Sequence, residues 1–181
     1  PNAFSCSAAV SACDKTGRWQ VALGLLDAMA LQRVEGNTVA HSAAVSACAT
    51  GACRRAALAL LGEMRRGRVE TRTTTFNAAL GACRRGGHWR HASHLLAAMG
   101  EAEVRRDVIS LNAAAASCEA AGRWREILEL MSTMAPVGGN GPERDAVTCS
   151  AAVGACERRG RRRPALELLA RMPRVGLQPN A

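Results

Sequence analysis

The sequence contains no tyrosine, and aromatic residues make up only 3% of its 181 positions. Sandwiches and barrels favour aromatic and β-branched side chains, whereas a core of Ala, Leu, Val, Met and Cys favours closely packed helices. Lysine is nearly absent as well, because Lys15 is the only one and the other basic residues are arginines. The 24 basic residues exceed the 15 acidic ones, and the resulting net charge of +9 indicates a polyanionic partner such as nucleic acid.

Two kinds of segment are also missing from the sequence. It has no run of eighteen apolar residues, which excludes a transmembrane helix, so we expect no membrane partner. Its first residues, Pro1 to Phe4, lack the charged start followed by an apolar stretch that is typical of a targeting segment. We therefore expect no secretory or transit segment within this sequence.

The eight cysteines follow a long period instead of forming short pairs. No CxxC pair occurs, which argues against a zinc or disulfide framework. Five of them recur at intervals of 35, 35, 35 and 38 residues: Cys13, Cys48, Cys83, Cys118 and Cys156. We expect these to be buried packing residues, because equivalent positions on stacked helices lie roughly 8–10 Å apart, too far for a disulfide. The other three, Cys6, Cys53 and Cys149, are expected to be core or half-exposed thiols, as in a reducing compartment.

The same period divides the chain into five units, which are 3–37, 38–72, 73–107, 108–145 and 146–180. The fourth unit is longer by three residues, and this insertion falls in the Gly- and Pro-rich segment 136–142. A fixed period of this length is typical of helix-pair arrays. Pro179-Asn180-Ala181 at the end repeats Pro1-Asn2-Ala3 at the start, so we expect residues 1–181 to be one repeat array taken from a longer one.

Each unit predicts two helices joined by a tight turn. The first helix contains the Ala-rich stretches 7–13, 42–48, 77–83, 112–118 and 150–156, which are strong helix formers. In four units a glycine follows four residues after the cysteine and should cap this helix: Gly17, Gly87, Gly122 and Gly160. The second unit has Gly51 one place earlier, so we expect its turn to differ.

The second helix has an apolar stripe at i, i+3, i+4 and i+7. The stripes are Ala22, Leu25, Leu26, Met29; Ala57, Leu60, Leu61, Met64; Ala92, Leu95, Leu96, Met99; Ile127, Leu130, Met131, Met134; and Ala165, Leu168, Leu169, Met172. A helix pair this short cannot bury its own stripe, whereas stacked pairs bury it against their neighbours. The predicted fold is therefore all-α, an α-solenoid superhelix of five helix-turn-helix repeats of about 35 residues.

The repeats resemble the pentatricopeptide repeat family. The resemblance lies in the polar fifth residue of each unit, the cysteine followed by glycine, the apolar stripe ending in Met, and the closing Gly176-Leu177-Gln178-Pro179-Asn180. It covers nearly the whole chain. One difference is the fourth residue, usually Tyr or Phe in this family, which here is Cys6, His41, Phe76, Leu111 or Cys149. The resemblance implies sequence-specific binding of single-stranded RNA, with one base per repeat.

The resemblance also assigns roles to individual residues. The fifth and last residues of each unit are implied to contact the base edge together, as the pairs Ser7 and Asn37, Ser42 and Arg72, Asn77 and Asp107, Asn112 and Asp145, and Ser150 and Asn180. By the same resemblance, Ser with Asn implies adenine and Asn with Asp implies uracil, so the implied site is 5′-A-x-U-U-A-3′. The second residues, Phe4, Val39, Thr74, Ile109 and Val147, are implied to stack against the bases.

Residue chemistry supports this interpretation independently. Only Ser and Asn occur at the fifth position, although the surrounding helix is rich in Ala and neither residue favours a helix interior. Both can donate and accept hydrogen bonds, as the edge of an unstacked base requires. Arg72 is the exception, because it only donates and is long enough to reach a phosphate.

Several arginines fall just after the first helix or in the turn, where they could contact phosphates: Arg54, Arg55, Arg84, Arg85, Arg158 and Arg159. A solvated convex face is the alternative explanation for such charges. The run of arginines over residues 158–163 could also be a localisation patch, although the repeat's own Gly160 interrupts it.

Nothing in the sequence predicts an enzyme, a metal site or a cofactor. No nucleophile, histidine and acid stand together apart from the repeat pattern. His88, His91 and His94 have no acidic or cysteine neighbour at ligand spacing, so we expect a solvated surface there. The alternative function is a protein-interaction scaffold of the tetratricopeptide type, which usually has a period of 34 residues. The family resemblance implies organellar RNA processing, stability, editing or translation, in a mitochondrion or plastid, with any catalytic or effector domain outside this segment.

Overall fold

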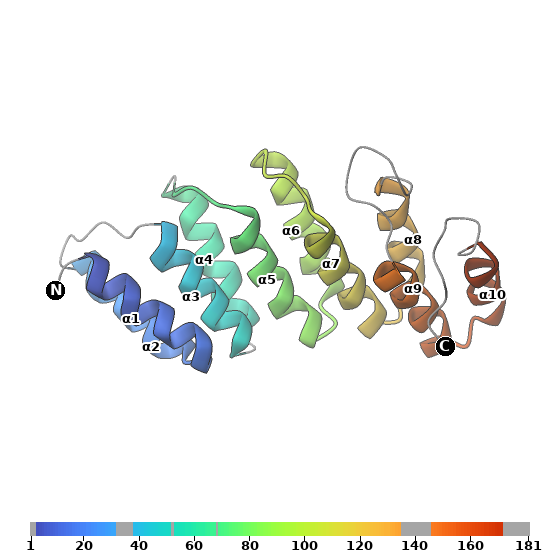
Figure 1. The fold of residues 1–181 in the computed structure, drawn as a ribbon, viewed down its shortest axis with the longest axis horizontal. Helices are drawn as coiled ribbons and strands as arrows, with labels where there is room; N and C mark the ends of the chain where they lie inside the picture. The colour runs from blue at the N-terminus through green and yellow to red at the C-terminus, as the bar shows by residue number, and fades with distance from the viewer. Residues whose placement is uncertain (1–2, 32–37, 52, 68, 135–145, 172–181) are drawn as a thin grey trace. The chain divides into compact units, whose positions relative to one another are not determined.

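The computed structural model describes residues 3–31, 38–51, 53–67, 69–134 and 146–171 (Figure 1). These residues form ten helices and no strand. The bounds are α1 Ala3–Thr16, α2 Trp19–Leu31, α3 Thr38–Thr50, α4 Arg54–Arg66, α5 Thr73–Arg85, α6 Trp89–Glu101, α7 Val108–Ala120, α8 Trp124–Thr133, α9 Ala146–Arg158 and α10 Arg162–Arg171. The predicted all-α class, with two helices per repeat, is therefore confirmed. None of the described helices is long and apolar enough to cross a membrane.

The helices belong to two compact parts, an N-terminal part over residues 1–82 and a C-terminal part over residues 83–181. In the N-terminal part, α1 packs against α2 and α3, and α3 packs against α2 and α4. In the C-terminal part, α7 packs against α6, α8 and α9, and α9 packs against α8 and α10. The first helix of a repeat thus contacts its own second helix and the first helix of the next repeat, which is the packing of a solenoid.

The core consists of the residues that the period predicts. The stripes of α4 and α6 are completely buried, and the five periodic cysteines are buried in every first helix. In α8 only Ile127 of the stripe is buried within the helix, and Leu130 and Met131 pack partly buried against the cluster formed by α7 and α9. Small side chains make this arrangement possible, because Ala114, Ala115, Ala151 and Ala152 are all buried where first helices meet.

The turn between the two helices is a Schellman motif in four repeats. Gly17, Gly87, Gly122 and Gly160 all have φ between 60° and 65°, a conformation that costs other residues roughly 1–2 kcal/mol. The N–H of the next residue donates to the carbonyl oxygen of the periodic cysteine, for example from Arg123 to Cys118 at 2.8 Å. The periodic cysteine and glycine are therefore the two ends of one helix cap, and the predicted capping role of the glycines is confirmed.

The turn of the second repeat differs, as expected. Here Cys53 donates its N–H to the carbonyl oxygen of Cys48 at 2.8 Å, and Gly51 donates to Ala47 at 2.9 Å. A Cβ on Gly51 would meet the indole of Trp19 and would lie 2.7 Å from the carbonyl oxygen of Gly17. Gly51 is required because the preceding repeat approaches it closely.

Burial of the periodic cysteines makes stability sensitive to alkaline pH. Burial raises the thiol pKa of Cys118 to about 12 and that of Cys48 to about 11, from 9.0, with smaller contributions from Glu126 and Cys53 respectively. The unfolded chain therefore loses these protons first as the pH rises above 9. The stabilisation is complete below pH 9 and is lost as the pH approaches 11 to 12.

We expect the free energy of unfolding, measured in urea under reducing conditions, to fall between pH 9 and pH 11 by up to about 1.4 kcal/mol per pH unit for each such thiol. Apart from the cysteines, few groups titrate in this range, because the chain has no tyrosine and one lysine. The variant Cys118→Ala should have a shallower slope. Equal slopes for the two proteins would contradict this assignment of the pH dependence.

Candidate nucleic-acid interface

The second residue of the first helix is exposed in every repeat whose side chain is described there. Val39 is 57% exposed, Ile109 is 65% exposed and Val147 is 57% exposed, and Thr74 is exposed as well. Phe4, the predicted counterpart in the first repeat, has a side chain outside the described part of the structure. Exposed aliphatic side chains at one repeat position form a surface that a ligand can cover at no cost in polar desolvation.

The fifth residue lies one helical turn after the second residue, so both are on one side of the helix. Ser42, Asn77 and Asn112 are half-buried, Ser7 is buried, and Ser150 is exposed. Two of these side chains hydrogen-bond to the next repeat. Ser42 Oγ lies 2.7 Å from Thr75 Oγ1, and Thr148 Oγ1 donates to Asn112 Oδ1 at 2.6 Å.

The last residue of a unit directly precedes the next first helix, which gives it a structural role that the sequence analysis missed. Asp107 is the N-cap of α7, and its Oδ1 accepts from the Ser110 N–H at 2.7 Å. Ser110 Oγ accepts from the Asp107 N–H at 2.9 Å, which completes a capping box. Asn and Asp are preferred N-caps, so capping explains the residue type at this position without RNA. A carboxylate can accept more than one hydrogen bond, so the cap still permits a base contact.

The geometry of the five predicted base-edge pairs is not fixed by the described residues. Arg72 is exposed and lies 3.6 Å from Glu70, in an ion pair at the surface. Asn37, Asp145 and Asn180 lie outside the described residues. The pairing of each fifth residue with a last residue therefore stays a prediction.

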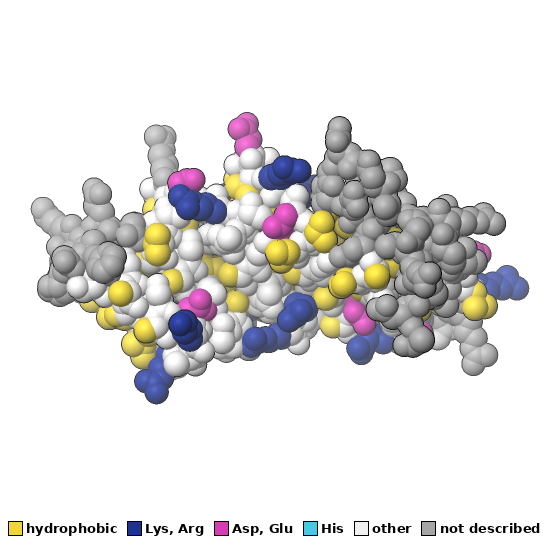
Figure 2. All heavy atoms as spheres, in the orientation of Figure 1, with side chains coloured by type: hydrophobic (Ala, Val, Ile, Leu, Met, Phe, Trp, Pro, Cys, Tyr) yellow, Lys and Arg dark blue, Asp and Glu magenta, His cyan; other side chains and the backbone are white. Residues whose placement is uncertain are grey.

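The predicted turn arginines lie at helix ends. Arg54 and Arg55 begin α4, Arg84 and Arg85 end α5, and Arg158 ends α9, followed by Arg159 in the turn. In the view of Figure 2, Lys and Arg side chains are scattered over this face, and several lie next to Asp or Glu side chains.

One group of arginines in the C-terminal part converges on a polar hollow of about 460 Å³. Arg123, Arg125, Arg159 and Arg161 line it, together with one acidic residue, Glu126. The first two come from the turn and second helix of the fourth repeat, and the other two come from the turn of the fifth repeat. Of these four, the sequence analysis expected only Arg159 to contact phosphates, because their convergence depends on how the repeats stack.

Local contacts hold two of these arginines in place. The Arg123 guanidinium lies 4.1 Å from the ring centroid of Trp89, and its Nε lies 3.2 Å from Glu126. Arg159 donates from Nη2 to the Ala121 carbonyl oxygen at 3.4 Å. Arg123 is also the N-cap residue of α8, so the positive end of that helix dipole faces the same region. With four cations and one anion, the hollow suits a phosphate group.

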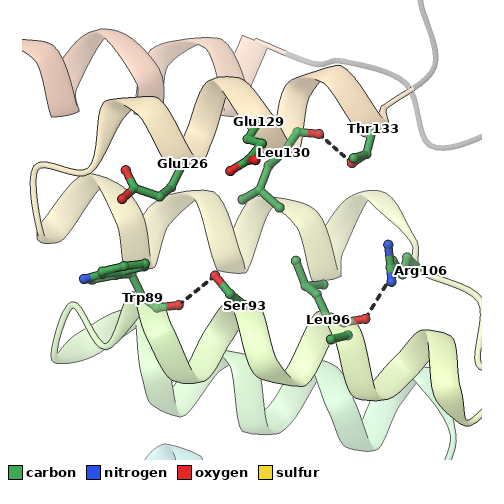
Figure 3. A pocket seen from close by; sticks show the side chains of 9 residues that line it. Trp89, Ser93, Leu96, Arg106, Glu126, Glu129, Leu130 and Thr133 are labelled. Atoms are coloured by element: carbon green, nitrogen blue, oxygen red, sulfur yellow. Dashed lines mark hydrogen bonds between the residues drawn. The ribbon is translucent and has the colours of Figure 1, made fainter.

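Two further hollows lie between the second helices of successive repeats. The one in Figure 3 has a volume of about 440 Å³ and is lined by Trp89 and Leu96 on α6, with Glu126, Glu129 and Leu130 across from them on α8. Arg106 lies at one end, where its Nε donates to the Leu96 carbonyl oxygen at 3.0 Å. A similar hollow of about 320 Å³ lies between α2 and α4. Neither is lined by a predicted base-contacting residue.

Cysteine and histidine form no metal centre among the described residues, where no group of three His, Cys, Asp or Glu side chains could hold an ion. All eight cysteines are free thiols, and Cys6 and Cys53 are the half-buried ones. His88 and His91 form an edge-on ring pair at 6.2 Å.

Comparison with solved structures supports the repeat assignment. The pentatricopeptide repeat protein PPR10 from maize matches with a TM-score of 0.73 and 23% identity, over 99% of this chain and 25% of PPR10. PPR10 in complex with an 18-nt psaJ RNA element matches with a TM-score of 0.78 and 25% identity, over 99% and 26%. The pentatricopeptide repeat domain of Arabidopsis thaliana protein-only RNase P 1, in complex with tRNA, matches with a TM-score of 0.75 and 14% identity, over 96% and 90%.

This chain spans about a quarter of the length of PPR10. No protein-family model and no curated protein matches it. The identification thus rests on the repeat pattern of the sequence together with these structural matches. The period, the capped turns and the helix packing agree with one another, and the chain has the fold of an array of pentatricopeptide repeats.

Proposed function

We propose that this chain binds single-stranded RNA sequence-specifically, with one base per repeat and the site 5′-A-x-U-U-A-3′. The observation that carries the proposal is the exposure of aliphatic side chains at the second residue, one turn before a polar fifth residue, in helices α3, α7 and α9. A flat base can cover the aliphatic surface while its edge meets the polar side chain. PPR10, which matches this chain at 25% identity, has been solved with a bound RNA element, and this supports RNA as the partner.

The composition of this surface predicts modest affinity. Aromatic side chains that stack on bases contribute roughly 1–3 kcal/mol per base, and aliphatic side chains contribute less. Val39, Ile109 and Val147 provide dispersion contacts without a π-face. Specificity would then depend mainly on the polar fifth and last residues, and affinity on contacts to the phosphates.

The wider role follows from the same proposal. We propose that the chain acts in organellar RNA processing, stability, editing or translation, in a mitochondrion or plastid. It would serve as the RNA-binding module, and any catalytic or effector activity would come from another domain or partner.

Binding to short RNAs tests the proposal directly. Fluorescence anisotropy with labelled oligonucleotides that contain AxUUA, compared with scrambled sequences of equal composition, should give tighter binding to the first set. Equal affinity for both sets would refute base reading. Failure to bind any RNA at low salt would instead favour the protein-interaction scaffold.

The arginine hollow predicts how binding depends on salt. If about five phosphates are contacted, log affinity should fall against log salt with a slope near −3 to −4. The double variant Arg159→Gln and Arg161→Gln should make this slope shallower by roughly 1 to 1.5 and weaken binding about equally for all sequences.

A matched control removes the same charge elsewhere. Arg66 and Arg90 are exposed on the second helices α4 and α6, and neither lines the hollow. The double variant Arg66→Gln and Arg90→Gln should keep the slope of the unmodified protein. Equal slopes in the two double variants would show that the hollow makes no phosphate contact.

A further inference from the structure

The hydrogen bonds that Ser42 and Asn112 make to the next repeat follow a rule that the RNA code does not include. In each case the partner of the fifth residue is the third residue of the next repeat. Thr75 on α5 reaches Ser42 on α3, and Thr148 on α9 reaches Asn112 on α7. Both threonines are almost completely buried, at 1% and 0% exposure, while Ser42 and Asn112 remain half-exposed.

The donor and the acceptor can be assigned in the hydrogen bond between Thr148 and Asn112. The amide oxygen only accepts, so Thr148 donates its O–H to Asn112 Oδ1. The separation of 2.6 Å is typical of an O–H···O bond and short for an N–H···O bond. The amide oxygen of Asn112 thereby accepts a hydrogen bond within the protein, and the NH₂ group is the part of the amide that can donate.

We propose that Thr148 is a positioning residue that sets the base preference of the fourth repeat by holding Asn112 as a hydrogen-bond donor. This inference rests on the proposed function. A fixed donor fits a carbonyl oxygen of uracil, whereas an amide that turned freely could offer its oxygen instead and accept from the amino group of adenine or cytosine. Thr148 itself is buried and does not touch the base.

The third residues of the other repeats differ in what they offer. They are Ser5, Ala40, Thr75, Ser110 and Thr148. Ala40 has no hydroxyl group. Ser110 Oγ is engaged with Asp107, to whose carbonyl oxygen it donates at 2.7 Å and from whose N–H it accepts at 2.9 Å. The Ser42 and Thr75 hydroxyls can each donate or accept, so Thr75 holds Ser42 in place without fixing its polarity. Of the two contacts, the one between Asn112 and Thr148 is therefore the one that fixes whether the fifth residue donates or accepts.

The test removes the hydroxyl while keeping the shape of the side chain. In Thr148→Val, discrimination between AxUUA and RNAs with adenine or cytosine as the fourth base should fall by roughly tenfold. Thr148→Ser should retain it, because serine keeps the donor. The matched control Thr75→Val should leave discrimination at the fourth base unchanged. A role in packing alone would weaken binding to all these RNAs equally and would overturn the inference.

A measurement without RNA separates this inference from the proposed function. The side-chain NH₂ resonances of Asn112, followed by ¹⁵N NMR relaxation, should report an ordered amide in the unmodified protein and in Thr148→Ser, and a mobile one in Thr148→Val. Unchanged order in Thr148→Val would overturn the positioning role even if RNA were read as proposed. Loss of order in Thr148→Val, together with an absence of base preference in the unmodified protein, would support the positioning contact and refute the code.

Discussion

Exchanging Asn112→Ser together with Asp145→Asn should move the preference at the fourth base from uracil to adenine. The new pair has the composition of Ser7 with Asn37, to which the family resemblance assigns adenine. A well-placed polar pair contributes about 1–3 kcal/mol of discrimination, so the preference should change by roughly 5- to 150-fold. The new serine can still be held by the next repeat, because Ser42 already reaches Thr75 from the equivalent position.

The measurement compares four RNAs that differ only in the fourth base. A matched control makes the same exchange one repeat earlier, with Asn77→Ser and Asp107→Asn, which should change the third base alone. Asparagine caps helices about as well as aspartate, so the cap of α7 should survive Asp107→Asn. If binding persists and uracil is still preferred at the fourth base, the fourth repeat does not read by this code.

The repetition of the sequence explains why the fold could be predicted in detail. A single Ala-rich stretch with a cysteine and a glycine is weak evidence for any structure. Its recurrence at a fixed period places Gly17, Gly87, Gly122 and Gly160 at one structural position, and all four have the positive φ that a helix cap requires. Each first helix also begins at the first residue of a predicted unit, as at Thr38 and Val108.

Contacts between repeats were harder to predict from the sequence. Asn112 and Thr148 are 36 residues apart, and only the register of α7 against α9 brings their polar atoms together. The signal was present in the frequent Ser or Thr at the third position, but hydroxyl side chains occur near helix starts for several reasons. The arginine hollow has the same origin, since Arg123 and Arg161 line it from two successive repeats.

Asp107 shows how one residue type can satisfy two requirements. Asp107 precedes α7 and caps it by accepting a hydrogen bond from the helix. The same carboxylate oxygens can also accept a hydrogen bond from the edge of a base. Residue type alone therefore cannot distinguish capping from RNA reading at the last position of a unit. Ser and Asn at the fifth position have a structural use as well, because Ser42 contacts Thr75 and Asn112 contacts Thr148 in the next repeat, so RNA binding has to be measured to separate the two roles.

The low aromatic content makes one side chain unusually important for stability. Phe76 is the largest of the fully buried side chains among the described residues, and it occupies the fourth position of its repeat. The equivalent positions hold smaller side chains, such as Leu111 and Cys149. The variant Phe76→Ala should lower the free energy of unfolding by about 3–5 kcal/mol, because it removes a fully buried side chain and leaves a cavity.

Thr74 provides the control for this prediction, because it lies two residues away on the same helix and is exposed. Thr74→Ala should change the free energy of unfolding in urea by no more than about 0.5 kcal/mol. In a solenoid each repeat is stabilised by its neighbours, so the damage from Phe76→Ala should be largest in the second and third repeats. Hydrogen exchange should then show lost protection in α3 and α5, with α9 much less affected. Uniform loss of protection along the chain would show that the array unfolds as a single cooperative unit.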